Sequence, residues 1–423
     1  MSTVDDLTRR RFLTLSGVTA AGAIAYGATR VSWTDLLAGA VTDPLAPDAG
    51  VLVVVTLYGG NDGLNTVIPA ADHIYQDARN ELAYAPEAVL DLGDGLGLSP
   101  GLKGMKRLWD AKQLAVVRGV GYPKPDHSHF RSMAIWQTAS PDAPARTGWL
   151  GRWLDVTGDD PLRALSVEPV LPPLLAGDKV AGATLPASGL KLPTGALGTA
   201  FQALGTPQPG EGADAARAAK SVTDLYEAAR VLGDAKAKHE DPDPTQNEDE
   251  TRTNGASAGG RGALGVQLDL VATLIEAGVP TRAYSVSLGG FDTHANERDT
   301  QQRLLAELDG ALVPFVDRMR RSDRGRNAVV LVYSEFGRRV HANASDGTDH
   351  GTAGPAFVLG DRVHGGFYGE QPSLADLVDG DLKETTDFRD IYATLLDGVL
   401  GTDPGPILHD HKGRLDRLLA RHQ

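Results

Sequence analysis

The stretch VLVVVTLYGGNDGLN, from Val51 to Asn65, joins a continuous apolar run to a single acid. An apolar run without polar alternation predicts a strand that is buried on both faces of a parallel sheet. Beyond the end of this strand, two glycines are followed by Asp62, which stands between Asn61 and Gly63. The sequence therefore predicts a central strand whose end presents a carboxylate at the edge of a sheet.

Four more short apolar runs follow along the chain, separated by segments with helical periodicity. This alternation predicts an α/β fold with a mostly parallel sheet, covered by helices on both faces. We expect strands at 51–57, 113–118, 282–288, 328–333 and 355–359, and helices at 100–110, 129–139, 147–156, 263–277 and 297–320.

The domain organisation follows from shifts in composition. Residues 50–400 are predicted to form one α/β domain that carries a loop-rich insertion at 160–262. Within that insertion, 239–261 is acidic and almost free of large apolar residues, so we expect an exposed, poorly ordered loop there. Residues 401–423 read as a C-terminal tail.

The net charge argues against nucleic-acid binding, and the absence of cysteine limits the residues that could hold a metal ion. The formal net charge is -14 over 423 residues, which argues against nucleic-acid binding, because that function requires clustered Lys and Arg. The chain has no Cys, so a metal ion would have to be held by His, Asp, Glu or main-chain oxygen.

The N-terminus resembles a twin-arginine export signal. Thr8 to Leu13 reads TRRRFL and precedes a weakly apolar, Gly- and Ala-rich run that extends to about Ala28. A stable membrane span needs about 20 strongly apolar residues, which this run does not offer. We expect residues 1–40 to direct export through the twin-arginine translocase to the periplasm, the cell surface or the medium. Cleavage is expected at Ala38-Gly39-Ala40 or nearer Ala28.

Residues that can bind a metal ion follow or precede nearly every predicted strand. Ligands of open α/β sheets bind outside the carboxyl ends of the strands, so these side chains are expected to meet at one edge. They are Asp62, His127, His129, Asp292, His294, Glu335, Asp349 and His350. Each has a structural alternative as well: helix capping for Asp292, an arginine partner for Glu335, and an Asx turn for Asp349.

A candidate nucleophile precedes the helix predicted at 129–139. Ser128 can cap this helix, or its hydroxyl can act as a nucleophile beside a metal ion. Arg131 lies one turn on, and Arg338 follows Glu335, so both are candidates for holding a substrate oxyanion. His127 and His129 are rival ligands or bases, and the sequence does not separate them.

Seven motifs, in this order along the chain, resemble an uncharacterised family of exported bacterial proteins assigned to the alkaline phosphatase and sulfatase superfamily. They are LYGGNDGLNTVIP, SHFRSMAIWQTA, TGWLGRWLD, SLGGFDTHAN, YSEFGRR, GTDHGTAGPAFVLG and TTDFRDIYATLL. The resemblance covers about residues 50–160 and 262–400, and it implies an alkaline-phosphatase-like fold.

The resemblance also implies a metal site and a nucleophile. Carried over by position, Ser128 is similar to the nucleophile, and the metal ligands would be Asp62, Asp292, His294, Glu335 and His350. The expected number of metal ions is one or two, but Phe336 stands where the superfamily has a second-site histidine and so removes a ligand of that site, which makes one ion, or none, conceivable. Alternatively, Asp349 and His350 are similar to the adjacent Asp and His ligands of the superfamily site. Glu335 would then contact a ligand rather than the metal ion.

Together these features predict an exported hydrolase or transferase that acts on a small phosphate or sulfate ester through a serine nucleophile. The expected cofactor is a divalent metal, namely Zn, Mn, Mg or Ca. One alternative is a noncatalytic secreted binding or assembly protein that keeps the fold. Another is a serine hydrolase using Ser128 with His127 or His129, although Ser128 does not stand in a G-x-S-x-G motif that would support it.

Overall fold

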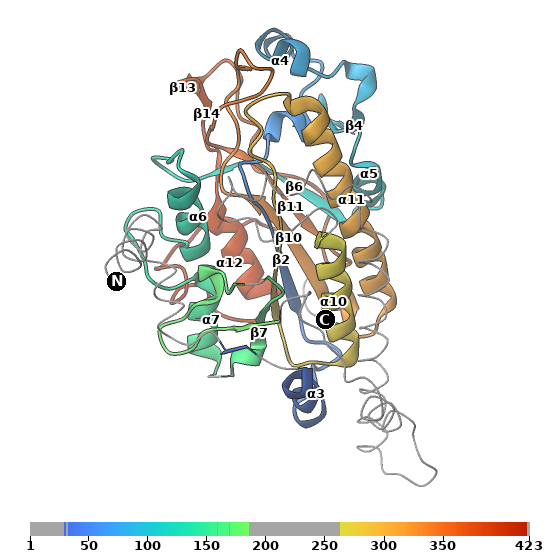
Figure 1. Cartoon of the computed structure of the whole chain (residues 1–423), viewed down its shortest axis with the longest axis vertical. Helices are drawn as coiled ribbons and strands as arrows, with labels where there is room; N and C mark the ends of the chain where they lie inside the picture. The colour runs from blue at the N-terminus through green and yellow to red at the C-terminus, as the bar shows by residue number, and fades with distance from the viewer. Residues whose placement is uncertain (1–28, 31–32, 159, 169, 186–262, 421–423) are drawn as a thin grey trace, which may run out of the picture.

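The computed structural model describes residues 29–30, 33–158, 160–168, 170–185 and 263–420. In these residues a central sheet is covered by helices on both faces (Figure 1). The expected acidic loop at 239–261 lies outside the described residues, as does most of the expected export segment.

The central sheet has ten strands in the described part of the chain, in the order β1-β8-β7-β9-β2-β10-β11-β6-β12, with β15 also pairing with β6. β2 lies between β9 and β10 and is parallel to both. Only β11 is antiparallel to its neighbours. The strands are β1 Thr29–Arg30, β2 Val51–Leu57, β6 Leu114–Gly121, β7 Ala164–Ser166, β8 Ala183–Thr184, β9 Ala283–Leu288, β10 Ala328–Ser334, β11 Gly354–Leu359, β12 Gly366–Tyr368 and β15 Thr386–Asp387.

The predicted α/β fold with a mostly parallel sheet is confirmed. The antiparallel strand has a consequence for the site, because its start lies at the edge where β2, β9 and β10 end. The segment that leads into β11 therefore reaches the same edge as the segments that leave the other three strands.

Side chains of β2 alternate between two hydrophobic cores, as the two-residue period of a strand requires. Val51, Val53 and Val55 belong to one core, and Leu52 and Val54 belong to the other. All five are fully buried, and burying a side chain of this size contributes about 1.5–3 kcal/mol. β2 is thus held from both faces, which makes its end a rigid support.

Helices cover each face of the sheet and complete the two cores. α5, α10 and α11 contribute to the core on one face, whereas α6, α7 and α12 contribute to the other (Figure 1). The helices are α3 Trp33–Thr42, α4 His73–Arg79, α5 Lys103–Asp110, α6 His129–Thr138, α7 Trp149–Thr157, α10 Ala263–Ala277, α11 Glu297–Arg321 and α12 Phe388–Gly398.

A smaller assembly lies at one end of the molecule, where α4, β13 and β14 are labelled in Figure 1. It includes a separate sheet in the order β3-β5-β4 and the hairpin of β13 with β14. A third hydrophobic cluster joins α4 to β14 through residues such as Tyr75 and Leu382. The elements of this smaller assembly are β3 Val67–Ile68, β4 Leu90–Gly93, β5 Leu96–Leu98, β13 Leu377–Val378 and β14 Asp381–Leu382, with 3-10 turns at Gly63–Asn65, Asn80–Leu82 and Pro86–Ala88. Three further 3-10 turns, Pro161–Arg163, Pro173–Leu175 and Gly325–Asn327, belong to the main body.

The described parts of the expected insertion and tail belong to the main body. In the insertion, β7 pairs with β9 and so extends the central sheet. In the tail, Leu408 and Leu418 are fully buried in the core beside α12. None of the helices in the described part of the chain combines the length and apolarity that crossing a bilayer requires.

Candidate metal centre

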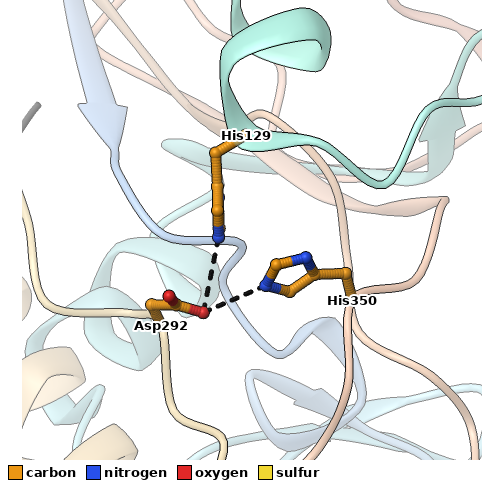
Figure 2. Close-up of side chains that lie close together, drawn as sticks. All are labelled: His129, Asp292 and His350. Carbon is orange, nitrogen blue, oxygen red and sulfur yellow. Dashed lines mark hydrogen bonds and ion pairs between the residues drawn. The ribbon is translucent and has the colours of Figure 1, made fainter. Parts of the chain in front are cut away.

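Three side chains from distant parts of the sequence converge at the edge where the strands end. They are His129 at the first position of α6, Asp292 in the segment after β9, and His350 before β11 (Figure 2). Each offers a ligand atom, and these atoms lie within 4.8 Å of one another. Asp292 Oδ1 is 3.1 Å from His350 Nε2 and 3.4 Å from His129 Nε2.

A fourth side chain, His294, stands beside this triad. Its Nε2 lies 3.0 Å from Asp292 Oδ1 and 3.0 Å from His350 Nε2. One carboxylate oxygen is therefore approached by three imidazole nitrogens, although it has only two lone pairs to offer. His129 Nε2 is buried and makes no hydrogen bond. Imidazole nitrogens and a carboxylate oxygen that lie this close together form a donor set that suits a cation.

An acceptor lies beside the outer nitrogen of each imidazole, and those of His129 and His350 are hydrogen-bonded. His129 Nδ1 lies 2.8 Å from Glu335 Oε1, and His350 Nδ1 lies 2.8 Å from the main-chain oxygen of His127. His294 Nδ1 is 3.4 Å from Asp349 Oδ1. Ligand histidines in metalloproteins show this pattern, because the acceptor selects the tautomer that points a lone pair at the metal. Glu335 and Asp349 thus lie behind the histidines.

The charges of the cluster are strongly coupled. Burial lowers the pKa of His129, but its interactions with Asp292 and Glu335 outweigh burial and raise this pKa to about 9. Burial raises the pKa of Asp292, yet its interactions with His129, His350 and Arg338 hold it well below its usual range. A metal ion would therefore replace a proton on His129, as metal binding to imidazole generally does.

The two glycines after β2 make room for the site. Both have positive φ, +115° at Gly59 and +72° at Gly60, which an L side chain rarely adopts. A Cβ at Gly59 would lie 2.5 Å from the main-chain nitrogen of Asp292, and one at Gly60 would lie 2.3 Å from the Phe336 ring. The glycines therefore allow the segments after β9 and β10 to pack directly on the end of β2.

Arg338 ties these segments together, which corrects the prediction that it holds a substrate oxyanion. Its side chain is fully buried. Its guanidinium donates to Asp292 Oδ1 and to four main-chain oxygens, those of Gly59, Gly60, Phe291 and Thr348. With its nitrogens engaged inside the protein, Arg338 orients the carboxylate of Asp292 rather than a substrate.

Asp62 is also engaged elsewhere, which corrects its assignment as a metal ligand. Both of its oxygens pair with the Arg79 guanidinium, at 2.6 Å and 3.0 Å, and both side chains are fully buried. Oδ1 accepts a further bond from the main chain of Leu64. Asp62 is not a member of the group that could hold an ion. Its carboxylate neutralises Arg79, a residue of α4.

A second buried acid lies against Asp62. Glu297, at the start of α11, is fully buried and accepts a hydrogen bond from Thr348 Oγ1. Burial, followed by the charge of Asp62, raises the pKa of Glu297 to about 9. A raised pKa of this size keeps Glu297 protonated at neutral pH, which removes the repulsion that two buried carboxylates would otherwise exert.

The other predicted residues lie close to the triad. Ser128 is the N-cap of α6, is exposed, and makes no side-chain capping bond. Arg131 lies in the first turn of the same helix and is partly buried. His127 lies outside the triad, because its Nε2 bonds to Asp381 Oδ2 at 2.7 Å. The structure therefore separates the two histidines that the sequence left undecided, and places His129 among the candidate ligands.

Several residues of the site gave no signal in the sequence. Arg79 is a lone arginine in a helix that periodicity did not predict, and Asp381 lies in a short hairpin just before, and outside, the motif that begins at Thr385. Glu297 did have a signal in the sequence, because it directly follows the motif that contains Asp292 and His294. Its position at a helix start favoured an exposed capping role over burial.

Comparison with known proteins identifies the family. Residues 196–423, more than half of the chain, match the family model described as "Protein of unknown function (DUF1501)". The chain belongs to this family. Membership of a family of unknown function, predicted from the motifs, is thus confirmed. No curated protein matches the sequence.

Two solved structures resemble the chain at low sequence identity. One is a protein in the alkaline phosphatase superfamily from Vibrio parahaemolyticus, with 12% identity, a TM-score of 0.38, and coverage of 92% of this chain and 79% of that chain. The other is a phosphonate monoester hydrolase from Silicibacter pomeroyi, with 11% identity, a TM-score of 0.31, and coverage of 86% and 77%. Likeness at these scores is too distant to assign residues, so the site rests on its own contacts.

The buried acid pair predicts a particular dependence of stability on pH. Unfolded Glu297 loses its proton near pH 4.3, whereas in the folded protein it keeps the proton up to about pH 9. Between these values the folded state holds one more proton, so Glu297 makes stability fall as pH rises, by at most about 1.4 kcal/mol per unit. Glu297→Gln keeps the hydrogen bonds without the titration.

We expect the free energy of unfolding of Glu297→Gln, relative to the wild type, to increase steadily from about pH 5 to pH 9. Urea unfolding at several pH values measures this difference, and Glu307→Gln on the same helix serves as the control. A constant difference across the range would show that Glu297 is not protonated in the folded state.

Proposed function

We propose that this protein is a metal-dependent hydrolase or transferase whose metal centre consists of His129, Asp292 and His350, with His294 as a fourth ligand or a neighbour. The observation that carries the proposal is the convergence of three imidazoles on Asp292 Oδ1, with the outer nitrogens of His129 and His350 each hydrogen-bonded to an acceptor. A partly buried triad in which His129 and His350 are each oriented by an acceptor is an arrangement that suits a cation.

The donor set narrows the choice of metal. Imidazole nitrogens with one carboxylate oxygen suit zinc, manganese or a similar transition metal. Magnesium and calcium favour oxygen ligands, which this cluster supplies only through Asp292. Of the four metals considered from the sequence, Zn and Mn thus fit the residues better than Mg and Ca.

The surroundings favour one ion. The buried Phe336 ring packs against His129 and His350, with centroids 4.8 Å and 5.0 Å away. This apolar ring occupies the side of the cluster next to β10. A single cation there would supply Lewis-acid stabilisation of negative charge.

A small phosphate or sulfate ester is the substrate class that we propose. Ser128 offers a hydroxyl one residue before a candidate ligand, at an exposed position with no capping bond to occupy it. Arg131 in the first turn and the free main-chain N–H groups of α6 favour an anionic group at this helix end. Ser128 is therefore the candidate nucleophile, and Arg131 the candidate for binding the oxyanion.

Two alternatives remain as outcomes of the tests. A noncatalytic secreted protein that keeps one structural ion is favoured by the packing of Phe336 on the triad. A serine hydrolase would need an imidazole bonded to Ser128. In the described part of the chain, His127 and His129 bond instead to Asp381 and Glu335.

The metal centre predicts tight binding of one equivalent of Zn²⁺ or Mn²⁺. Replacing His350 by Ala removes a ligand, so we expect the affinity of the protein for Zn²⁺ to fall by about 100-fold or more. This loss exceeds the one expected from removing a residue that only hydrogen-bonds to a ligand. His341→Ala, at an exposed histidine of the same loop, should leave the affinity unchanged. Calorimetric titration of the chelator-treated protein makes the measurement. Uptake of less than one equivalent by the wild type would exclude a metal enzyme.

Catalysis is tested with the metal-loaded protein on a panel of aryl phosphates and aryl sulfates. Ser128→Ala should lose turnover by on the order of 10³-fold while it binds Zn²⁺ like the wild type, because Ser128 is not a ligand. Unchanged turnover would remove Ser128 as the nucleophile. A wild type that binds metal but turns over no ester would favour the noncatalytic alternative.

Export through the twin-arginine translocase is part of this proposal, although residues 1–28 lie outside the described residues. Ala38-Gly39-Ala40 lies within α3, and Leu36 and Ala40 of this helix are buried in a core. Cleavage nearer Ala28 would keep α3 intact, so we favour it. Replacing Arg9 and Arg10 by Lys should retain the chain in the cytoplasm, as cell fractionation would detect. Unchanged export would contradict the assignment.

A further inference from the structure

The segment before α6 holds one of the candidate ligands through its main chain. His350 Nδ1 lies 2.8 Å from the carbonyl oxygen of His127. A carbonyl oxygen can only accept a hydrogen bond, so Nδ1 carries the proton and Nε2 is left to face Asp292. The position of the His127 carbonyl therefore decides which nitrogen of His350 is available to a metal ion.

The side chain of His127 is in turn held by Asp381. Its Nε2 lies 2.7 Å from Asp381 Oδ2, and Asp381 is almost fully buried in β14. The other oxygen of Asp381 makes no hydrogen bond, and its nearest cation is Arg339 Nε at 3.8 Å. His127 itself is about half-exposed, with 45% of its side chain accessible. The bond to Asp381 is thus what anchors this otherwise exposed ring.

The same short strand also holds the segment that carries His350. The main-chain oxygen of Leu382, the residue after Asp381, accepts a hydrogen bond from Thr352 Oγ1 at 2.5 Å. Thr352 lies two residues beyond His350. β14 therefore binds both partners of the His127–His350 hydrogen bond, one through a side chain and the other through its main chain.

From these contacts we propose that Asp381 is a positioning residue of the metal centre: by holding His127, it fixes the carbonyl that keeps His350 in the Nδ1–H tautomer. This inference rests on the proposed function, because it assumes that His350 binds a metal ion. Asp381 touches neither the ion nor a substrate in this account. It acts on the metal through two intervening hydrogen bonds.

The expected effect of replacing Asp381 is a loss of metal affinity of the size seen when a group that orients a ligand is removed. Losing a group that orients a metal ligand weakens metal affinity by about 10- to 100-fold. Asp381→Ala should therefore weaken binding of Zn²⁺ by this factor. Asp381→Asn should stay close to the wild type, because its amide oxygen can still accept the bond from His127 Nε2. Asp376→Ala is the matched control, since Asp376 is an exposed acid just before the same hairpin and pairs with Lys383.

A second measurement does not depend on metal. In the metal-free protein at about pH 8, where an ordinary imidazole is neutral, long-range nitrogen–proton correlation spectra report the tautomer of each ring. His350 Nδ1 should carry a proton in the wild type, in Asp381→Asn and in Asp376→Ala. In Asp381→Ala, where the His127 carbonyl loses its anchor, the fraction of His350 with a proton on Nδ1 should fall. His127→Ala, which leaves the carbonyl in place without its anchor, should reproduce this fall even if Asp381→Ala does not fold.

The two measurements separate the two proposals. A wild type that binds no Zn²⁺ would remove the metal centre, while the spectra would still show whether Asp381 sets the His350 tautomer. Unchanged spectra and unchanged affinity in folded Asp381→Ala and His127→Ala would overturn the positioning role. Equal losses in Asp381→Asn and Asp381→Ala would also overturn it, because the hydrogen bond alone would then not explain the effect.

Discussion

The site depends on one buried guanidinium. Arg338 donates to the segment after β2, to the segment after β9 and to the segment before β11, and it bonds directly to the carboxylate of Asp292. A buried charge is tolerated only when polar partners surround it, and the planar fork of arginine can satisfy several acceptors at once. Three separate loops are therefore held in one arrangement by a single side chain.

This arrangement is possible because the sheet brings the loops to one edge. β2, β9 and β10 are parallel and end together, whereas the antiparallel β11 begins there. The two glycines after β2 then let the neighbouring segments approach its main chain. Side chains as distant in sequence as His129 and His350 can therefore share one carboxylate oxygen, on a support packed against two hydrophobic cores.

Behind the candidate ligands lies a continuous set of polar contacts. The main-chain oxygen of Thr348 accepts a hydrogen bond from Arg338, and the hydroxyl of Thr348 donates one to the protonated Glu297. Glu297 in turn lies against the Asp62–Arg79 pair. On another side, β14 holds both His127 and Thr352. The cluster is thus surrounded by groups that orient it, as ligand sites of metalloproteins generally are. Many of the charged side chains near the site therefore hold the candidate ligands and their neighbours in place rather than contact a substrate.

The sequence by itself determined the α/β class, the central strand at 51–57 and the edge at which metal-binding residues gather. Apolar runs and glycines report burial and turns directly, and parallel strands must end at one edge. Only the tertiary structure decided that His129 rather than His127 enters the cluster, that Asp62 pairs with Arg79, and that Arg338 turns inward. All of these lie in loops or at helix ends, where no period relates position to direction. Their orientation depends on partners that come from elsewhere in the chain.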